Sequence, residues 1–160
     1  MVDPKQKSKA RSNGRSGKRK KLLKNFTLYL DESFNCGEVR ELLDSASIKY
    51  RLYSQDFRSS EDDPPILRLA GEKGWALLTC DRQNRYRDVE RRAVLYYKVR
   101  QFVFSGNMGG IPMARLLVSI KNEMRQFCRD HERPFVATIT QSGKISLRMD
   151  KNGNTHDRKK

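Results

Sequence analysis

Apolar and polar positions alternate in blocks from residue 25 onward, and the blocks switch between strand-like and helix-like periods. Short apolar runs predict buried strands, and longer stretches with apolar residues three or four positions apart predict amphipathic helices. The predicted strands are Phe26–Leu30, Tyr50–Tyr53, Trp75–Leu78, Gln101–Phe104, Pro134–Thr140 and Lys144–Met149. The predicted helices are 35–46, 64–74, Asp88–Lys98 and Pro112–His131.

Strands that alternate with helices of ten or more residues are typical of crossover connections in a parallel sheet. We therefore expect an α/β fold, a three-layer α/β/α sandwich with a mostly parallel sheet. Only the short turn Gln141–Gly143 separates the last two predicted strands. The domain should accordingly close with a C-terminal β-hairpin.

Acidic residues stand at three boundaries of these elements. Asp31 ends the first apolar run, Asp63 precedes Pro64 as an expected helix cap, and Asp81 ends the third run. Residues just past the carboxyl ends of parallel strands converge on one crevice. Carboxylates crowded there repel unless a cation neutralises them, and hard oxygen ligands suit Mg²⁺ or Mn²⁺. Capping alone would explain any one acid, but their recurrence favours a shared metal site.

Glu90 and Thr79 are further candidates for this site. Asp88 and Glu90 lie roughly 200° apart on a helix, so only one can face inward. Glu90 is closer to the predicted packed face, whereas Asp88 suits a solvated first turn. Thr79 precedes Asp81 by two positions and shares its side of the strand. Its hydroxyl either orients a carboxylate or a substrate phosphate, or belongs to a β-branched residue that fills the strand end.

The net charge of +15 is concentrated in the two tails. Residues 1–24 hold ten Lys or Arg and one acid, and residues 151–160 hold four and one, which leaves +3 for residues 25–150. A polybasic arm with few apolar residues cannot fold alone and attracts RNA or DNA, although it would also serve as a solubilising tail. We expect a disordered basic tail (1–24), one domain (25–150) and a basic C-terminal tail (151–160).

The remaining composition indicates the compartment. The three cysteines Cys36, Cys80 and Cys128 are too widely spaced for a disulfide framework or a zinc knuckle, which favours a reduced intracellular environment. No apolar stretch approaches the ~20 residues needed to span a bilayer. The N-terminus lacks the apolar core of a secretory signal. We expect a cytoplasmic protein with no membrane partner.

One stretch of the chain resembles a known family. The run from Asp63-Pro64-Pro65 through Gly74-Trp75 and Thr79-Cys80-Asp81 to Glu90, with Leu30-Asp31-Glu32 upstream, resembles the PIN-like domain. It is most similar to the VapC-type toxin ribonucleases, and the resemblance spans about residues 26–148. This resemblance implies an α/β/α sandwich with an acidic pocket for one or two divalent cations, and endonucleolytic cleavage of RNA.

The resemblance also assigns roles to residues. The implied catalytic and metal-binding residues are Asp31, Asp63, Asp81 and Glu90, with Mg²⁺ or Mn²⁺ as cofactor. Some relatives carry another acid two residues after the position of Asp81, where this chain has Gln83. Arg82, Arg85 and Arg87 would grip substrate phosphates near Thr79, or else belong to a solvated face.

These features predict a Mg²⁺/Mn²⁺-dependent endoribonuclease, the toxin of a toxin–antitoxin pair. RNA, an antitoxin protein and a second copy of the chain are the candidate partners. The alternative is an RNA-binding or ribosome-associated adaptor with a degenerate PIN-like pocket, which Gln83 favours and the retained acids oppose. A phosphoacceptor domain of the receiver type would carry a lysine just after its fifth strand. This interpretation is disfavoured, because the predicted fifth strand is followed here by Gln141-Ser142-Gly143.

Overall fold

A computed structural model describes residues 26–30, 34–56, 63–81, 88–106 and 108–156 of the chain. Its centre is a six-stranded sheet with the strand order β2-β1-β3-β4-β5-β6. The strands are β1 (Thr27–Leu30), β2 (Lys49–Leu52), β3 (Ala76–Asp81), β4 (Arg100–Ser105), β5 (Phe135–Ile139) and β6 (Ile145–Met149). Neighbouring strands pair in parallel except β5 and β6, which form an antiparallel hairpin.

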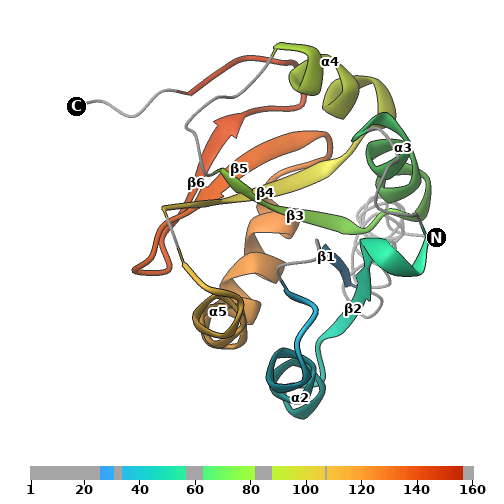
Figure 1. Ribbon diagram of the computed structural model, residues 1–160. Coiled ribbons are helices and arrows are strands. Elements are labelled where there is room, and N and C mark those ends of the chain that lie inside the picture. Colours follow the sequence, from blue (N-terminus) through green and yellow to red (C-terminus); the bar gives the residue numbers. More distant parts are fainter. Residues whose placement is uncertain (1–25, 31–33, 57–62, 82–87, 107, 157–160) are drawn as a thin grey trace, which may run out of the picture.

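Helices cover both faces of this sheet (Figure 1). They are α2 (Gly37–Ser45), α3 (Asp63–Lys73), α4 (Asp88–Tyr97) and α5 (Gly110–Asp130), with a short 3-10 helix, η2 (Tyr53–Gln55), after β2. Helices α2 and α5 pack on one face, and α3 and α4 pack on the other. The predicted three-layer α/β/α sandwich with a closing hairpin is therefore confirmed.

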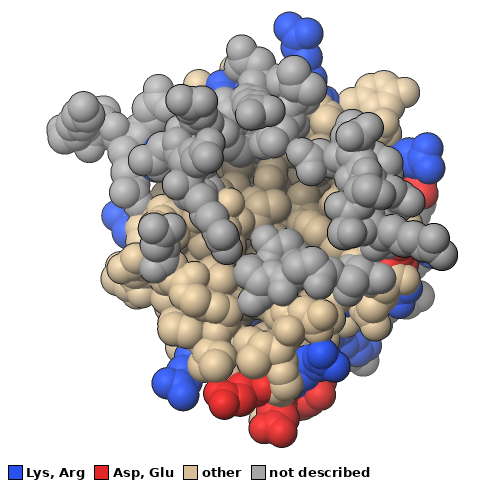
Figure 2. Space-filling model, in the orientation of Figure 1, with Lys and Arg blue, Asp and Glu red and all other residues tan. Residues whose placement is uncertain are grey.

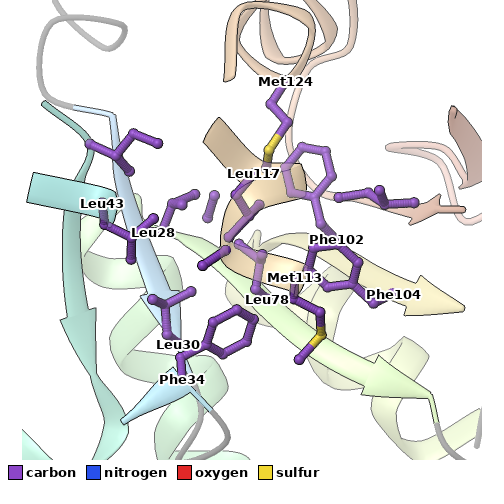
Figure 3. Packing of buried hydrophobic residues seen from close by; sticks show 14 of the residues in the cluster. Leu28, Leu30, Phe34, Leu43, Leu78, Phe102, Phe104, Met113, Leu117 and Met124 are labelled. Carbon is purple, nitrogen blue, oxygen red and sulfur yellow. The ribbon is translucent and has the colours of Figure 1, made fainter. Parts of the chain in front are cut away.

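Strict alternation along the strands creates two separate cores. Leu28 and Leu30 of β1 face α2 and α5, whereas Tyr29 between them faces α3. Figure 3 shows the larger core, in which side chains from β1, β3 and β4 meet Leu43 of α2 and Leu117 of α5. Because most strands are buried on both sides, their sequences read as continuous apolar runs.

Three of the helices end in the same way. Ser47, Gly74 and Lys98 follow α2, α3 and α4 with φ angles of 56°, 70° and 57°. Each next residue donates its amide to a carbonyl five positions earlier: Ile48 to Leu43, Trp75 to Ala70, and Val99 to Val94. These are Schellman turns, which satisfy the last carbonyls of the helix and turn the chain directly into the next strand.

Helices α3 and α4 approach each other closely at one glycine. A Cβ atom on Gly71 would overlap the carbonyl oxygen of Tyr97. Glycine is therefore required at this contact, because any side chain would push the two helices apart. The contact fixes the spacing of α3 and α4 on their face of the sheet.

Element boundaries differ from the predicted ones where pairing extends a strand. The third strand is predicted to stop at Leu78, but it continues to Asp81, because Phe104 and Ser105 of β4 pair with Cys80 and Asp81. The second strand stops at Leu52, where η2 begins. Helix α3 begins at Asp63 itself, one residue before the predicted first helical position.

Hydrogen bonding continues past the hairpin. The Asp150 carboxylate accepts the amides of Asn152 and Asn154 at 3.0 Å each. The turn brings Thr155 into a bridge with Met149, and the His156 amide donates to the Arg148 carbonyl at 2.7 Å. Residues 151–156 thus return along β6 and cover part of this edge of the sheet.

The close approach of α3 and α4 generates a first prediction. Replacing Gly71 by Ala should lower the free energy of unfolding by about 1–3 kcal/mol, because the added methyl overlaps the backbone of α4. Chemical denaturation followed by circular dichroism measures this change. Gly37→Ala is the matched control, since nothing lies within 4 Å of a Cβ at that position. Equal stability of the Gly71→Ala protein and the control would contradict the close approach.

Candidate active site at the carboxyl edge of the sheet

The strand order reverses between β1 and β3. From β1 the chain crosses to β2 on one side, and the later strands β3, β4 and β5 follow on the other. In an open parallel sheet, ligands bind in the crevice at the carboxyl ends of the two strands that flank such a reversal. Leu30, the last residue of β1, pairs with Leu78 of β3 at this point. The candidate site therefore lies beyond these two residues.

Asp81 is the last residue of β3 and pairs with Ser105, the last residue of β4. Its backbone thus stands at the carboxyl edge, three positions past the level of Leu30 and Leu78. Asp31 lies outside the described residues, and in the sequence it follows Leu30 directly. Strands β1 and β3 are adjacent, as predicted, but Asp81 is the last residue of β3 and does not follow it.

Asp63 and Glu90 belong to the first turns of α3 and α4. Each stands one turn before a buried apolar residue of its own helix, Leu67 in α3 and Val94 in α4. Gly71 of α3 contacts Tyr97 of α4. Asp63 precedes Gly71 by eight residues, roughly 12 Å along the axis of α3, and Glu90 precedes Tyr97 by seven residues, roughly 10.5 Å along the axis of α4. Because both helices lead from the carboxyl edge towards the opposite edge, their first turns lie at the carboxyl edge.

Thr79 is held by a buried neighbour on β4. The Gln101 side chain donates a hydrogen bond from Nε2 to Thr79 Oγ1 at 3.1 Å. Gln101 is 5 % exposed, and it packs on the face that carries Leu77 and Val103. The position of the Thr79 hydroxyl is therefore defined by the sheet and by one specific hydrogen bond, two residues before Asp81.

The predicted phosphate-gripping residues Arg82, Arg85 and Arg87, with Gln83 among them, lie outside the described residues. The described surface includes one acidic helix. Figure 2 shows acidic side chains gathered over α2, whose outer face carries the exposed residues Glu38, Glu41 and Asp44. This acidic helix belongs to the opposite layer of the sandwich from α3 and α4.

A cluster of aromatic and charged residues packs against β1 on the face of the sheet that α3 and α4 cover. The buried Tyr29 ring lies 4.6 Å from the Tyr53 ring and 5.0 Å from the Trp75 ring. Arg51 stacks over Trp75 at 5.9 Å and donates two hydrogen bonds of 2.6 Å to the Asp56 carboxylate. The Tyr53 hydroxyl donates to the Leu78 carbonyl at 3.4 Å, which ties the end of β2 to β3 across β1.

The charges in this cluster shift two pKa values. The hydrogen bonds from Arg51 lower the pKa of Asp56 below its ordinary value of 3.8. Burial, with the nearby Asp56 carboxylate, raises the pKa of Tyr29 above its ordinary value of 10.0. Tyr29 is therefore a neutral phenol at physiological pH, and Asp56 is a paired anion. Both are structural groups that keep β1 and β2 in place.

This pair generates a second prediction. A carboxyl whose pKa is lowered on folding stabilises the fold above its ordinary value of 3.8 and loses that contribution as the pH falls through the lowered value. Asp56→Asn should therefore reduce the melting temperature at pH 7, and the gap to wild type should narrow below pH 4. Glu72→Gln is the control, because its pair with Arg68 is long (3.8 Å) and about two-thirds exposed. A gap that stays constant from pH 7 to pH 3 would contradict this assignment.

The residues at the edge have the chemistry of a site for a hard cation. Asp63, Asp81 and Glu90 offer carboxylate oxygens, which suit Mg²⁺ or Mn²⁺ and not a soft metal. Within the described ranges, no group of three or more His, Cys, Asp or Glu side chains is placed so that it could hold a metal ion. The nearest thiol, on Cys80, contacts Met113 in the core, 3.4 Å between the sulfur atoms. Cys36, Cys80 and Cys128 form no disulfide, and burial raises the pKa of Cys128 to about 12.

Comparison with known proteins identifies the class. Residues 27–106 match the family described as PIN like domain, whose fold is of a nuclease type. The match covers half of the chain and runs from β1 to the end of β4, including Asp31, Asp63, Thr79, Asp81 and Glu90. The chain belongs to the PIN-like domain family. Its members are typically nucleases that act on RNA and generally bind divalent metals.

The other comparisons add no relative. Neither the search of curated proteins nor the search of solved structures gave a match. The matched family description names the domain as a whole and no toxin branch of it. Among the helices of the described residues, none has the length and apolar character that crossing a membrane requires.

Sequence reasoning missed Gln101 as a residue of this region. The signal was present, because an amide side chain stands beside the otherwise apolar run Phe102-Val103-Phe104 of the predicted strand. Its partner Thr79 lies 22 positions earlier, so only the parallel pairing of β3 and β4 reveals the contact.

Proposed function

We propose that this protein is a divalent-metal-dependent endoribonuclease that hydrolyses RNA phosphodiester bonds. The observation that carries the proposal is the common location of Asp63, Asp81 and Glu90 at the carboxyl edge of a PIN-like sheet, where the sequence also continues from Leu30 into Asp31. Acidic residues that recur at the ends of elements leading to the edge where the strand order reverses support cation binding over a structural role.

The proposed role of each residue follows from the chemistry of its side chain. The carboxylates of Asp31, Asp63, Asp81 and Glu90 would hold Mg²⁺ or Mn²⁺. Such a cation, when bound, would polarise the phosphoryl group and lower the pKa of the water molecule that it binds towards neutrality. Thr79 would donate a hydrogen bond to a phosphate oxygen from the floor of the site. Rigid strands and helices support these groups, so little reorganisation is needed during the reaction.

The charge distribution supports RNA as the substrate. An acidic pocket repels a polyanion, so cationic groups must surround it. Arg82, Arg85 and Arg87 follow Asp81 in the sequence, and residues 1–24 carry ten Lys or Arg. Three exposed acids, Glu38, Glu41 and Asp44, lie on α2, in the opposite layer of the sandwich from α3 and α4. We infer that RNA is held by these basic segments, with its backbone kept away from α2.

The resemblance to VapC-type ribonucleases extends the proposal to the toxin of a toxin–antitoxin pair. In that role an antitoxin protein would cover the acidic edge until it is degraded. A gene for a small DNA-binding protein beside the gene for this chain supports that extension, and its absence favours a free-standing ribonuclease.

The metal mechanism generates a third prediction. Asp81→Asn should lower Mn²⁺-dependent cleavage of a labelled single-stranded RNA by at least about a hundredfold, because a neutral amide replaces a charged ligand. Cleavage products resolved on a denaturing gel give the rate. The matched control is Asp44→Asn on the exposed outer face of α2, which should keep the wild-type rate.

Metal removal completes this test. Wild-type cleavage should stop in EDTA and return with added Mn²⁺. Full activity in EDTA, or wild-type activity of the Asp81→Asn protein, would contradict the mechanism. Tight RNA binding by the wild type without turnover at any metal concentration would favour the adaptor alternative.

The basic N-terminal arm generates a fourth prediction. Deleting residues 1–24 should weaken RNA binding and flatten its salt dependence, by about 0.7 in the log–log slope for each phosphate that the arm neutralises. Fluorescence anisotropy between about 50 and 300 mM salt measures both quantities. A full-length variant in which Ser replaces residues 18–21 separates charge from length. An unchanged slope in both proteins would exclude the arm from RNA binding.

A further inference from the structure

Gln101 is an unusual residue for its position. It is 5 % exposed and stands on β4 between the buried Arg100 and the buried apolar residues Phe102 and Val103. Burying an amide is unfavourable unless its hydrogen-bonding groups find partners. Its Nε2 finds one in Thr79 Oγ1 at 3.1 Å, across the β3–β4 pairing. The amide is thus aimed at a residue of the candidate site.

This hydrogen bond leaves the Thr79 hydroxyl able to donate its own hydrogen to another group. A hydroxyl has one hydrogen to donate and two lone pairs that accept. Because Gln101 Nε2 occupies one lone pair, the Thr79 hydrogen can be directed to a different acceptor. The branched Cβ of Thr79 restricts its χ1 torsion, so the hydroxyl position is narrowly defined. Thr79 is half-buried and stands two residues before Asp81.

We propose that Gln101 is a positioning residue of the nuclease site, which holds Thr79 as a hydrogen-bond donor to a non-bridging oxygen of the scissile phosphate. This inference rests on the proposed ribonuclease function. A site built from carboxylates has many acceptors and few donors, so a fixed hydroxyl donor next to Asp81 has a specific use. It would stabilise charge that increases on the phosphate in the transition state, and the effect is expected on kcat more than on KM.

A double-mutant cycle tests this inference. Thr79→Val removes the donor, and Gln101→Met removes the amide with little change of volume. Each single variant should lower kcat for Mn²⁺-dependent RNA cleavage about tenfold or more, with KM changed less than about threefold. A loss of this size corresponds to the removal of one hydrogen bond to a charged group. The double variant should lose no more than Thr79→Val alone, because Gln101 acts through Thr79. Gln126→Met, the same change at a side chain on the outside of α5, is the control and should keep wild-type kcat.

Further readouts separate positioning from stability. Melting temperatures should show all four proteins folded at the assay temperature. Thr79→Ser keeps the hydroxyl, so adding Gln101→Met to it should lower kcat by the same factor as in the wild type. If Gln101→Met is too unstable to assay, Gln101→Leu replaces it in the same cycle.

The outcomes distinguish the two proposals. A Gln101→Met protein that is less stable but keeps wild-type kcat when folded would show a purely structural amide and overturn this inference alone. Additive losses in the double variant would overturn it as well. A wild type that cleaves no RNA with Mn²⁺ would overturn the ribonuclease function and this inference with it.

Discussion

The parallel pairing of β1 with β3 is the constraint on which the rest of the structure depends. Leu28, Tyr29 and Leu30 pair with Ala76, Leu77 and Leu78, although 45 residues of chain and two helices separate the strands. The pairing buries both faces of β1 and places the strand-order reversal at its carboxyl end. Any acid that follows these strands then lies at one edge. The candidate site is therefore a consequence of strand order.

Two different kinds of contact keep this edge in place. The Schellman turns after α2, α3 and α4 set where each following strand begins, and the Gly71 contact sets the distance between α3 and α4. The cluster of Tyr29, Tyr53 and Trp75, with the Arg51–Asp56 pair, ties β2 to β1 and β3. These supports consist of apolar side chains, backbone groups and the paired charges of Arg51 and Asp56. They fix the strand and the helices to which Asp63, Asp81 and Glu90 belong.

The fold was predictable because its signals are local. Apolar runs, the Asp63-Pro64 start and the Gly74 end are readable within a few residues, and they predict the correct order of strands and helices. Strand ends were less accurate, because β3 reaches Asp81 only through its pairing with Phe104 and Ser105. Asp31, Asp63 and Asp81 are candidates because of their places at element ends, and Glu90 because it lies near the predicted packed face of its helix. The sequence did not predict the contacts of Gln101, Arg51 and Asp56. Their partners come near only in the folded sheet.

The central claim is that carboxylates from four separate segments share a divalent cation. A crystal structure of the full chain grown with Mn²⁺, with anomalous diffraction to locate the ion, tests this claim most directly. The account predicts manganese coordinated by oxygens of Asp81 and of at least two of Asp31, Asp63 and Glu90, next to the Thr79 hydroxyl. Carboxylates too far apart to reach one ion, or manganese bound only at another surface, would contradict it.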